Sequence, residues 1–205
     1  MMTVKSSTGA TRETLRAAVR VLKNGGVISF ATETTYGLAC DPRNAKAVKK
    51  IFLIKGRVES KPLQLIAGSF AQVNRLTQLT NIEKKLASTH WPGPLTMLVK
   101  LRAGKKLAPK VNPKRVIGIR VSSSDLARKI ADAFGHPIAA TSANRSGNAP
   151  AFSGRGVVRA FADFSCKPDL LLDSGRIPRR RPSTVARVRK DGSIDVIREG
   201  VIRFS

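Results

Sequence analysis

Cysteine, histidine and long apolar runs are scarce or missing in this 205-residue sequence. Its two cysteines, Cys40 and Cys166, are too few and too far apart for a CxxC motif, and we interpret them as free thiols in a reducing compartment. Only His90 and His136 are present, each beside a turn, which argues against a serine or cysteine triad. The first residues lack the apolar core of a secretory signal, and no apolar run approaches membrane-spanning length. We therefore expect a soluble, cytoplasmic protein without membrane contact.

Acidic residues are the second shortage. Against 38 Lys and Arg stand 13 Asp and Glu, which gives a formal net charge of +25. No carboxylate occurs between Glu83 and Asp125, and residues 176–190 contain six arginines and one lysine without any acid. Such a chain repels itself unless a phosphate ligand or a polyanion is near. The charge predicts affinity for nucleic acid but says nothing about specificity.

Common phosphate-binding and metal-binding motifs are missing as well. The sequence has no GxxxxGK[ST] loop, no GxGxxG after a strand, no HExxH and no zinc-like spacing. Any nucleotide would therefore be held by side-chain cations and hydroxyls. The side chains available for this are Lys55, Arg57, Lys61, Ser142 and Asn144. The basic stretch 55–61 follows a helical pattern and ends before Pro62, so it fits an anion-binding loop and a solvated helix end equally well.

Apolar periodicity predicts an α/β fold in a single domain over residues 11–205, preceded by a flexible N-terminus at residues 1–10. Helices are expected over residues 11–23, 44–56, 81–90, 124–134 and 154–161. Strands are expected over residues 27–31, 63–67, 95–101, 116–121, 138–140, 169–172, 182–188 and 194–198.

Two clusters of polar side chains follow predicted strands, at residues 32–37 and 141–147. Together with the basic loop they can converge at one rim of the sheet, where ligands of α/β proteins bind. Arg120 lies inside an apolar strand and is costly to bury without an anionic partner. That partner is a structural carboxylate or a substrate carboxylate. We favour the substrate because acids are scarce nearby in the sequence.

Eight ordered motifs carry a resemblance to the YrdC family of threonylcarbamoyl-AMP synthases, and their order and spacing agree with that family from about residue 12 to 203. They are TETTYGL at 32–38, KGR and KPL at 55–63, WPGPLT at 91–96, GIRV at 118–121, TSANRSG at 141–147, PSTVARV at 182–188 and IREG at 197–200. The resemblance implies a twisted open mixed sheet flanked by helices, with a concave basic cavity. It also implies a short-form enzyme that makes L-threonylcarbamoyladenylate and pyrophosphate from ATP, L-threonine and bicarbonate, for threonylcarbamoyladenosine in tRNA.

The resemblance also implies roles for individual residues. Its KxR and SxN signature falls on the catalytic candidates Lys55, Arg57, Ser142 and Asn144. The implied L-threonine contacts are Thr34, Arg120, Ala140, Ser183 and Thr184. The implied ATP contacts are Arg57, Lys61, Ser142, Asn144 and Arg198. Mg²⁺ would accompany ATP, with no protein ligand assigned, and Arg179, Arg180 and Arg181 receive no role.

Two alternatives remain open at this point. The first is a non-catalytic RNA-binding module that uses the same basic cavity, which the net charge alone would favour. The second is a relative that makes a different carbamoyl or acyl adenylate. Direct weak tRNA binding is equally open, because the downstream tRNA threonylcarbamoyl transferase machinery could be the only tRNA-binding partner.

Overall fold

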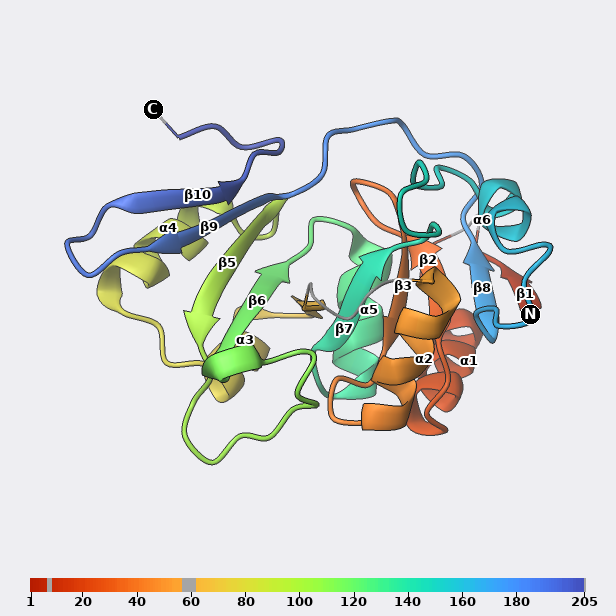
Figure 1. Cartoon of the computed structure of the whole chain (residues 1–205), viewed down its shortest axis with the longest axis horizontal. Helices are drawn as coiled ribbons and strands as arrows, with labels where there is room; N and C mark the ends of the chain where they lie inside the picture. The colour runs from red at the N-terminus through yellow and green to blue at the C-terminus, as the bar shows by residue number, and fades with distance from the viewer. Residues whose placement is uncertain (7–8, 57–61, 205) are drawn as a thin grey trace.

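The computed structural model describes residues 1–6, 9–56 and 62–204, which fold around one mixed ten-stranded β-sheet (Figure 1). The strand order is β1-β8-β2-β3-β7-β4-β6-β5-β9-β10. The strands are β1 (Met2–Lys5), β2 (Ile28–Ala31), β3 (Tyr36–Cys40), β4 (Gln64–Ala67), β5 (Leu95–Lys100), β6 (Val116–Val121), β7 (Ile138–Ser142), β8 (Leu170–Asp173), β9 (Thr184–Val188) and β10 (Ile194–Arg198). The predicted fold class is confirmed.

Helices begin and end where the sequence carries capping residues. They are α1 (Arg12–Lys23), α2 (Ala45–Lys55), α3 (Phe70–Leu76), α4 (Asn81–His90), α5 (Asp125–Phe134) and α6 (Gly154–Ala160), with a 3-10 turn η1 (Pro113–Arg115). The side chains of Thr11, Asn44 and Ser124 accept backbone N–H bonds at the starts of α1, α2 and α5. Gly56 ends α2 in the left-handed conformation, at a φ of 54°, which glycine adopts without a Cβ penalty.

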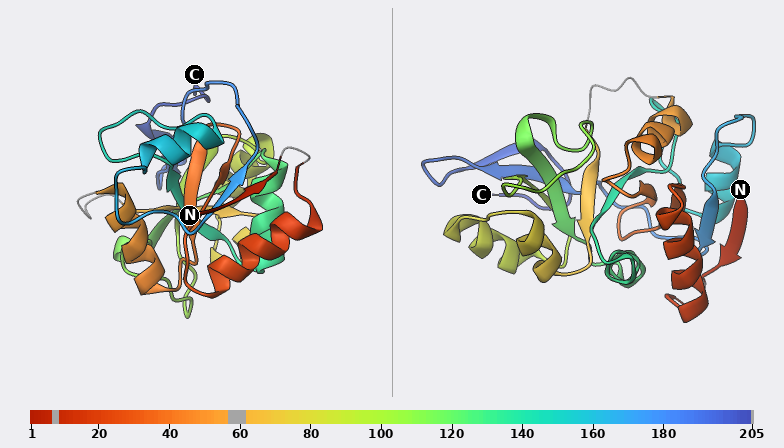
Figure 2. Two further views of the ribbon diagram at one scale, coloured as in Figure 1. Left: turned by 90° about the vertical axis from the view of Figure 1, so that its right-hand side faces the viewer. Right: turned by 90° about the horizontal axis from the view of Figure 1, so that it is seen from below.

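Apolar side chains alternate along the strands and fill a core on each face of the sheet. Phe30, Ile138 and Leu170 pack on one face with α1 and α5, and Leu38, Ala139 and Leu171 face the other core. Helices α1 and α5 lie side by side over their face (Figure 2). This period of two, with central strands such as β2 and β3 buried on both sides, is what a sheet covered by helices requires.

The N-terminus differs from the prediction. Residues 2–5 form β1, which pairs in parallel with β8, so the expectation of a flexible segment over residues 1–10 was wrong for this strand. Its side chains are mostly exposed, so no apolar alternation marks it in the sequence. Its partner strand is distant in the chain, and local patterns carry no information about such a pairing.

Two further elements were not predicted. Strand β3 follows directly on the hydroxyl-rich turn and pairs antiparallel with both β2 and β7. Helix α3 is only seven residues long, too short for a clear helical repeat. None of the described helices is long and apolar enough to cross a membrane.

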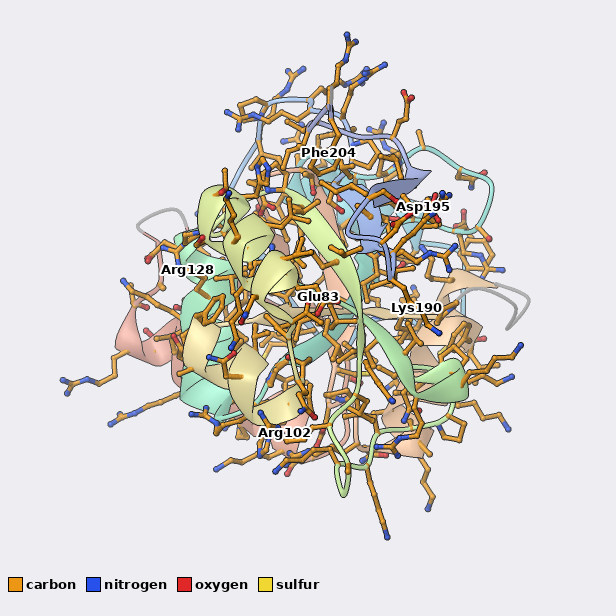
Figure 3. All side chains as sticks on the ribbon, turned by 90° about the vertical axis from the view of Figure 1, so that its left-hand side faces the viewer. Glu83, Arg102, Arg128, Lys190, Asp195 and Phe204 are labelled. Atoms are coloured by element: carbon orange, nitrogen blue, oxygen red, sulfur yellow. The ribbon has the colours of Figure 1, made fainter. Side chains whose placement is uncertain are left out.

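Nitrogen-tipped side chains project all around the outline of the molecule in Figure 3, and the labelled Arg102 and Lys190 are both exposed. Few of them have an acidic partner, because carboxylates are scarce. Asp195 on β10 is one exception and pairs with Arg187 at 2.6 Å and Arg189 at 3.3 Å.

Candidate functional site

A cavity of about 530 Å³ opens at the ends of the central strands. The connection between β8 and β9 runs from one end of the sheet to the other and brings Arg180, Pro182 and Ser183 to this cavity (Figure 1). Its other lining residues include Thr32, Thr34, Thr35, Lys55, Gln64, Arg120, Ala140, Thr141, Ser142, Asn144, Ser146 and Arg198. The two polar clusters and the start of the basic loop therefore meet at one rim, as predicted.

Lys55 fixes the loop that follows β7. The side chain is only 4% exposed, and its Nζ donates to the backbone oxygens of Ser142 at 2.8 Å and Asn144 at 3.0 Å. A third bond reaches Asn144 Oδ1 at 3.1 Å, which also accepts from Ser142 Oγ at 2.6 Å. An ammonium group has three N–H donors, and the loop accepts three hydrogen bonds from the one on Lys55. Lys55 thus positions Ser142 and Asn144.

A tight turn between β2 and β3 presents the threonine hydroxyls. Thr32 Oγ1 donates to the Thr35 carbonyl at 2.7 Å and accepts from the Thr34 N–H at 3.2 Å. Thr32 Oγ1 and Thr34 Oγ1 lie 3.1 Å apart. Thr34 is 6% exposed and lines the cavity, so its hydroxyl has a fixed position from which to meet a ligand.

Arg120 lines the cavity and forms a buried ion pair with Glu33. The Arg120 Nη1 donates to one oxygen of Glu33, and Ser122 Oγ donates to the other. Burial lowers the pKa of the Arg120 guanidinium, and the Glu33 carboxylate opposes that shift. The preference for a substrate carboxylate as the partner was therefore wrong in this structure, since a structural carboxylate 87 residues away fills the role. Arg120 still lines the cavity, and a guanidinium has further N–H donors for a second anion.

Ser183 and Arg198 also line the cavity and contact each other. Arg198 donates to the Ser183 carbonyl at 2.7 Å and to its hydroxyl at 3.0 Å. The Ser183 hydroxyl lies 3.0 Å from that of Thr96, and both are buried. Burial lowers the pKa of Arg198, with a smaller contribution from the positive charge of Arg120. Two mutually repelling guanidinium groups at one cavity make an anion a favourable occupant.

The remaining predicted residues divide into three groups. Ala140 lines the cavity with a small side chain. Thr184 is fully buried and points elsewhere, because its hydroxyl donates to the Ile202 carbonyl at 2.7 Å and accepts from the Ile202 N–H at 2.9 Å. Arg57 and Lys61 lie outside the described residues.

Sequence reasoning missed several residues that the cavity uses. Arg180 lines it, although the arginine run had no assigned role. Glu33 binds Arg120, and Thr96 contacts Ser183, in each case from a distant segment of the chain. The one local signal was the carboxylate of Glu33 beside a hydroxyl-rich turn, but nothing nearby identified its partner.

No acidic residue appears among the described side chains that line the cavity. Within the same described part of the chain, no group of three or more His, Cys, Asp or Glu side chains could hold a metal ion. The cavity therefore offers hydroxyls, amides and cations, a set suited to an anionic ligand more than to a bare cation.

Comparison with known proteins agrees with this geometry. The model of the Sua5/YciO/YrdC family, described as "Telomere recombination", matches residues 20–200. A threonylcarbamoyl-AMP synthase of Mus musculus is 35% identical over 195 residues, which cover 92% of this chain and 67% of that protein. A threonylcarbamoyl-AMP synthase of Chromobacterium violaceum is 34% identical over 171 residues, or 82% of this chain and 85% of that protein.

A solved structure shares the fold over almost the whole chain. The structure of P. abyssi Sua5 complexed with L-threonine superposes with a TM-score of 0.83 at 29% identity and covers 97% of this chain. The match spans 57% of that Sua5 chain, so P. abyssi Sua5 extends well beyond the shared region. By its matched family model, its curated relatives and its fold, the chain belongs to the Sua5/YciO/YrdC family.

Proposed function

We propose that this chain is an L-threonylcarbamoyladenylate synthase, which forms threonylcarbamoyl-AMP, pyrophosphate and water from ATP, L-threonine and bicarbonate. One observation carries the proposal. A single cavity with four cationic side chains and no acidic residue among its described lining collects every described candidate except Thr184. Those cavity residues are Thr34, Lys55, Arg120, Ala140, Ser142, Asn144, Ser183 and Arg198. The threonylcarbamoyl-AMP synthases among its relatives support the same activity.

Threonine would bind on the side of the cavity where Arg120, Thr34 and Ser183 meet. The other N–H donors of Arg120 would hold the amino-acid carboxylate, since Glu33 occupies the Nη1 donor. The hydroxyls of Thr34 and Ser183 would bind the substrate hydroxyl, whose loss in an isostere leaves buried polar groups unpaired. The L-threonine complex of P. abyssi Sua5 supports an amino-acid site in this fold.

The triphosphate of ATP would lie against Arg198 and Arg180. Both line the cavity and can hold phosphate oxygens through paired N–H bonds. Ser142 and Asn144, held in place by Lys55, would orient the nucleotide. Arg57 and Lys61 complete the proposed ATP contacts from the sequence motif alone.

The reaction needs positioning and charge neutralisation more than it needs a protein nucleophile. The threonine amine and bicarbonate condense to a carbamate with loss of water, and a carbamate oxygen then attacks the α-phosphorus of ATP. A new P–O bond forms, the bond to the β-phosphate breaks, and pyrophosphate leaves. Arginines that already lie at the cavity would offset the charge that develops on the phosphates.

Mg²⁺ would arrive as part of the ATP substrate, because the described lining offers it no carboxylate. The wider partners are also proposals. The adenylate would pass to a tRNA threonylcarbamoyl transferase, and a cytoplasmic location stays a prediction.

The experiment is an assay of pyrophosphate released from ATP by the purified chain. We expect release only when L-threonine and bicarbonate are both present, and a preference for threonine over valine that can reach ~10⁴. Equal release with valine would contradict the threonine site. Tight RNA binding without any release would instead favour the non-catalytic RNA-binding module.

A further inference from the structure

A second hollow of about 780 Å³ lies beside the proposed ATP cavity, and Pro150 lines both. Its walls come from the segment 149–156 at the start of α6, from the end of β8, and from the connection that follows β8. That connection places Arg179 in the second hollow and Arg180 in the first. The two spaces are therefore neighbours joined by consecutive arginines.

The second hollow is strongly cationic. Arg155, Arg159, Arg176 and Arg179 line it, and within the described part of the chain none of these guanidinium groups has a carboxylate partner. Asp173 is the one acidic residue in the described lining. Like charges gathered around a concave surface raise the local concentration of anions.

The Asp173 carboxylate is already engaged by the fold. Its Oδ1 accepts from the Tyr36 hydroxyl at 3.3 Å and from the Gly175 N–H at 2.9 Å. Gly154 lies so close that a Cβ there would approach the carboxylate to 2.1 Å. Asp173 therefore serves to join β3 to β8 and packs closely on the start of α6, and its single negative charge leaves the four arginines with a surplus of positive charge.

The two sides of the hollow are tied together, so its shape is built into the fold. Ser153 and Arg176 form an isolated antiparallel bridge, and the Ile177 N–H donates to the Phe152 carbonyl at 2.9 Å. The Arg179 guanidinium lies 5.5 Å from the centre of the Phe152 ring, a distance at which a cation–π contact orients it.

We propose that this second hollow is a binding site for a small polyphosphate. Arginine holds phosphate oxygens bidentately, and four arginines around one concave space match a compact ligand with several negative charges. An extended RNA backbone would instead need cations spread along a surface. The identification of pyrophosphate as the natural occupant rests on the proposed function, because that reaction releases pyrophosphate in the adjoining cavity. The binding of a polyphosphate to the second hollow does not depend on the proposed function.

The test is calorimetric titration of the full chain with pyrophosphate at fixed salt. Three paired variants are compared with the wild type: Arg155→Ser with Arg176→Ser in the second hollow, Arg180→Ser with Arg198→Ser in the first cavity, and Arg12→Ser with Arg16→Ser on α1 as a charge-matched control. We expect two sites in the wild type. The second-hollow pair should weaken one of them about tenfold or more, and the α1 pair should weaken neither.

Three results would overturn the proposal. In the first, the wild type has a single pyrophosphate site, and the first-cavity pair of substitutions removes it. In the second, the α1 pair weakens pyrophosphate binding as much as the second-hollow pair does. In the third, the second hollow binds inorganic phosphate and pyrophosphate with equal affinity. Binding of a short RNA oligonucleotide at the second hollow in place of pyrophosphate would also overturn it. If the second hollow binds pyrophosphate but the chain makes no adenylate, only the proposed function is refuted. If the chain makes the adenylate but the second hollow binds no pyrophosphate, only this inference is refuted.

Discussion

Tyr36 is the only tyrosine in the chain, so its ionisation can be followed alone. Burial raises the pKa of Tyr36 to about 12, and the nearby Asp173 carboxylate adds to this shift. The hydrogen bond from the Ser174 N–H opposes it. We expect the tyrosinate absorbance of the folded protein to appear near pH 12, and that of the urea-unfolded chain near pH ~10. Because the pKa of Tyr36 is raised in the folded state, protonated Tyr36 contributes to the free energy of unfolding. This contribution is complete below the pKa of the unfolded chain and is lost as the pH rises through the pKa of the folded protein.

Asp173→Asn provides the control for this titration. It removes the carboxylate charge that disfavours the tyrosinate, so the folded-state pKa should fall towards the ordinary value. A folded wild-type protein that titrates like the unfolded chain would contradict the buried position of Tyr36.

Glu33 should contribute to stability far more than a surface carboxylate does. Its side chain and that of Arg120 are each 8% exposed, so Glu33→Gln leaves a buried guanidinium without its counter-charge. We expect a decrease of about 3 kcal/mol in the free energy of unfolding, measured by urea denaturation. Asp125→Asn is the matched control, because Asp125 is 56% exposed and its pair with Lys129 should contribute less than ~1 kcal/mol. Equal decreases in the two variants would contradict the buried pair.

At the scale of elements, the C-terminal segment after β10 holds the start of β9 and Ser183, which precedes it. A Cβ on Gly200 would lie 2.2 Å from the Pro182 carbonyl oxygen and 2.4 Å from the Thr184 nitrogen. Gly200→Ala should therefore cost ~1–3 kcal/mol through overpacking and shift Ser183, which would lower both the melting temperature and adenylate synthesis. Val201→Ala, at a 44% exposed neighbour, should change neither. Unchanged activity in the Gly200 variant would show that Ser183 does not need this close approach.

The sequence predicts an element well when the residues that determine it are neighbours in the chain. Helix α4 has the predicted bounds because a capping box of Thr80 and Glu83 and the turn after His90 are all local signals. Strand β1 escaped prediction because its partner β8 lies far along the chain. Strand β3 pairs with the neighbouring β2 as well as with the distant β7, but it follows directly on the hydroxyl-rich turn, which drew attention as a polar cluster and not as the start of a strand. The site follows the same rule: Ser142 and Asn144 stand out in a polar cluster, whereas the Glu33–Arg120 pair joins residues that only the fold brings together.

At the scale of the whole molecule, the net charge of +25 predicts weak RNA binding without sequence choice. Residues 100–115 contain no acid and include the exposed Lys105 and Lys106. Changing both to Ser should weaken tRNA binding and lower the slope of log affinity against log salt by ~0.9 for each phosphate that these lysines neutralise. The measurement is tRNA binding across a salt series.

The charge-matched control for tRNA binding is again Arg12→Ser with Arg16→Ser on α1. If the α1 pair lowers the salt slope as much as the Lys105 and Lys106 pair does, the binding follows net charge and has no defined surface. An unchanged affinity in both pairs would remove residues 100–115 from any role in RNA binding.

The central claim is that the cavity joins threonine, bicarbonate and the α-phosphate of ATP into one product. Mass spectrometry of a reaction with ¹³C-labelled bicarbonate tests this most directly. We expect L-threonylcarbamoyladenylate that carries the labelled carbon, in amounts equal to the pyrophosphate released, and little product from an Arg198→Ala variant. An unlabelled threonyl adenylate, or ADP with phosphate in place of pyrophosphate, would contradict it.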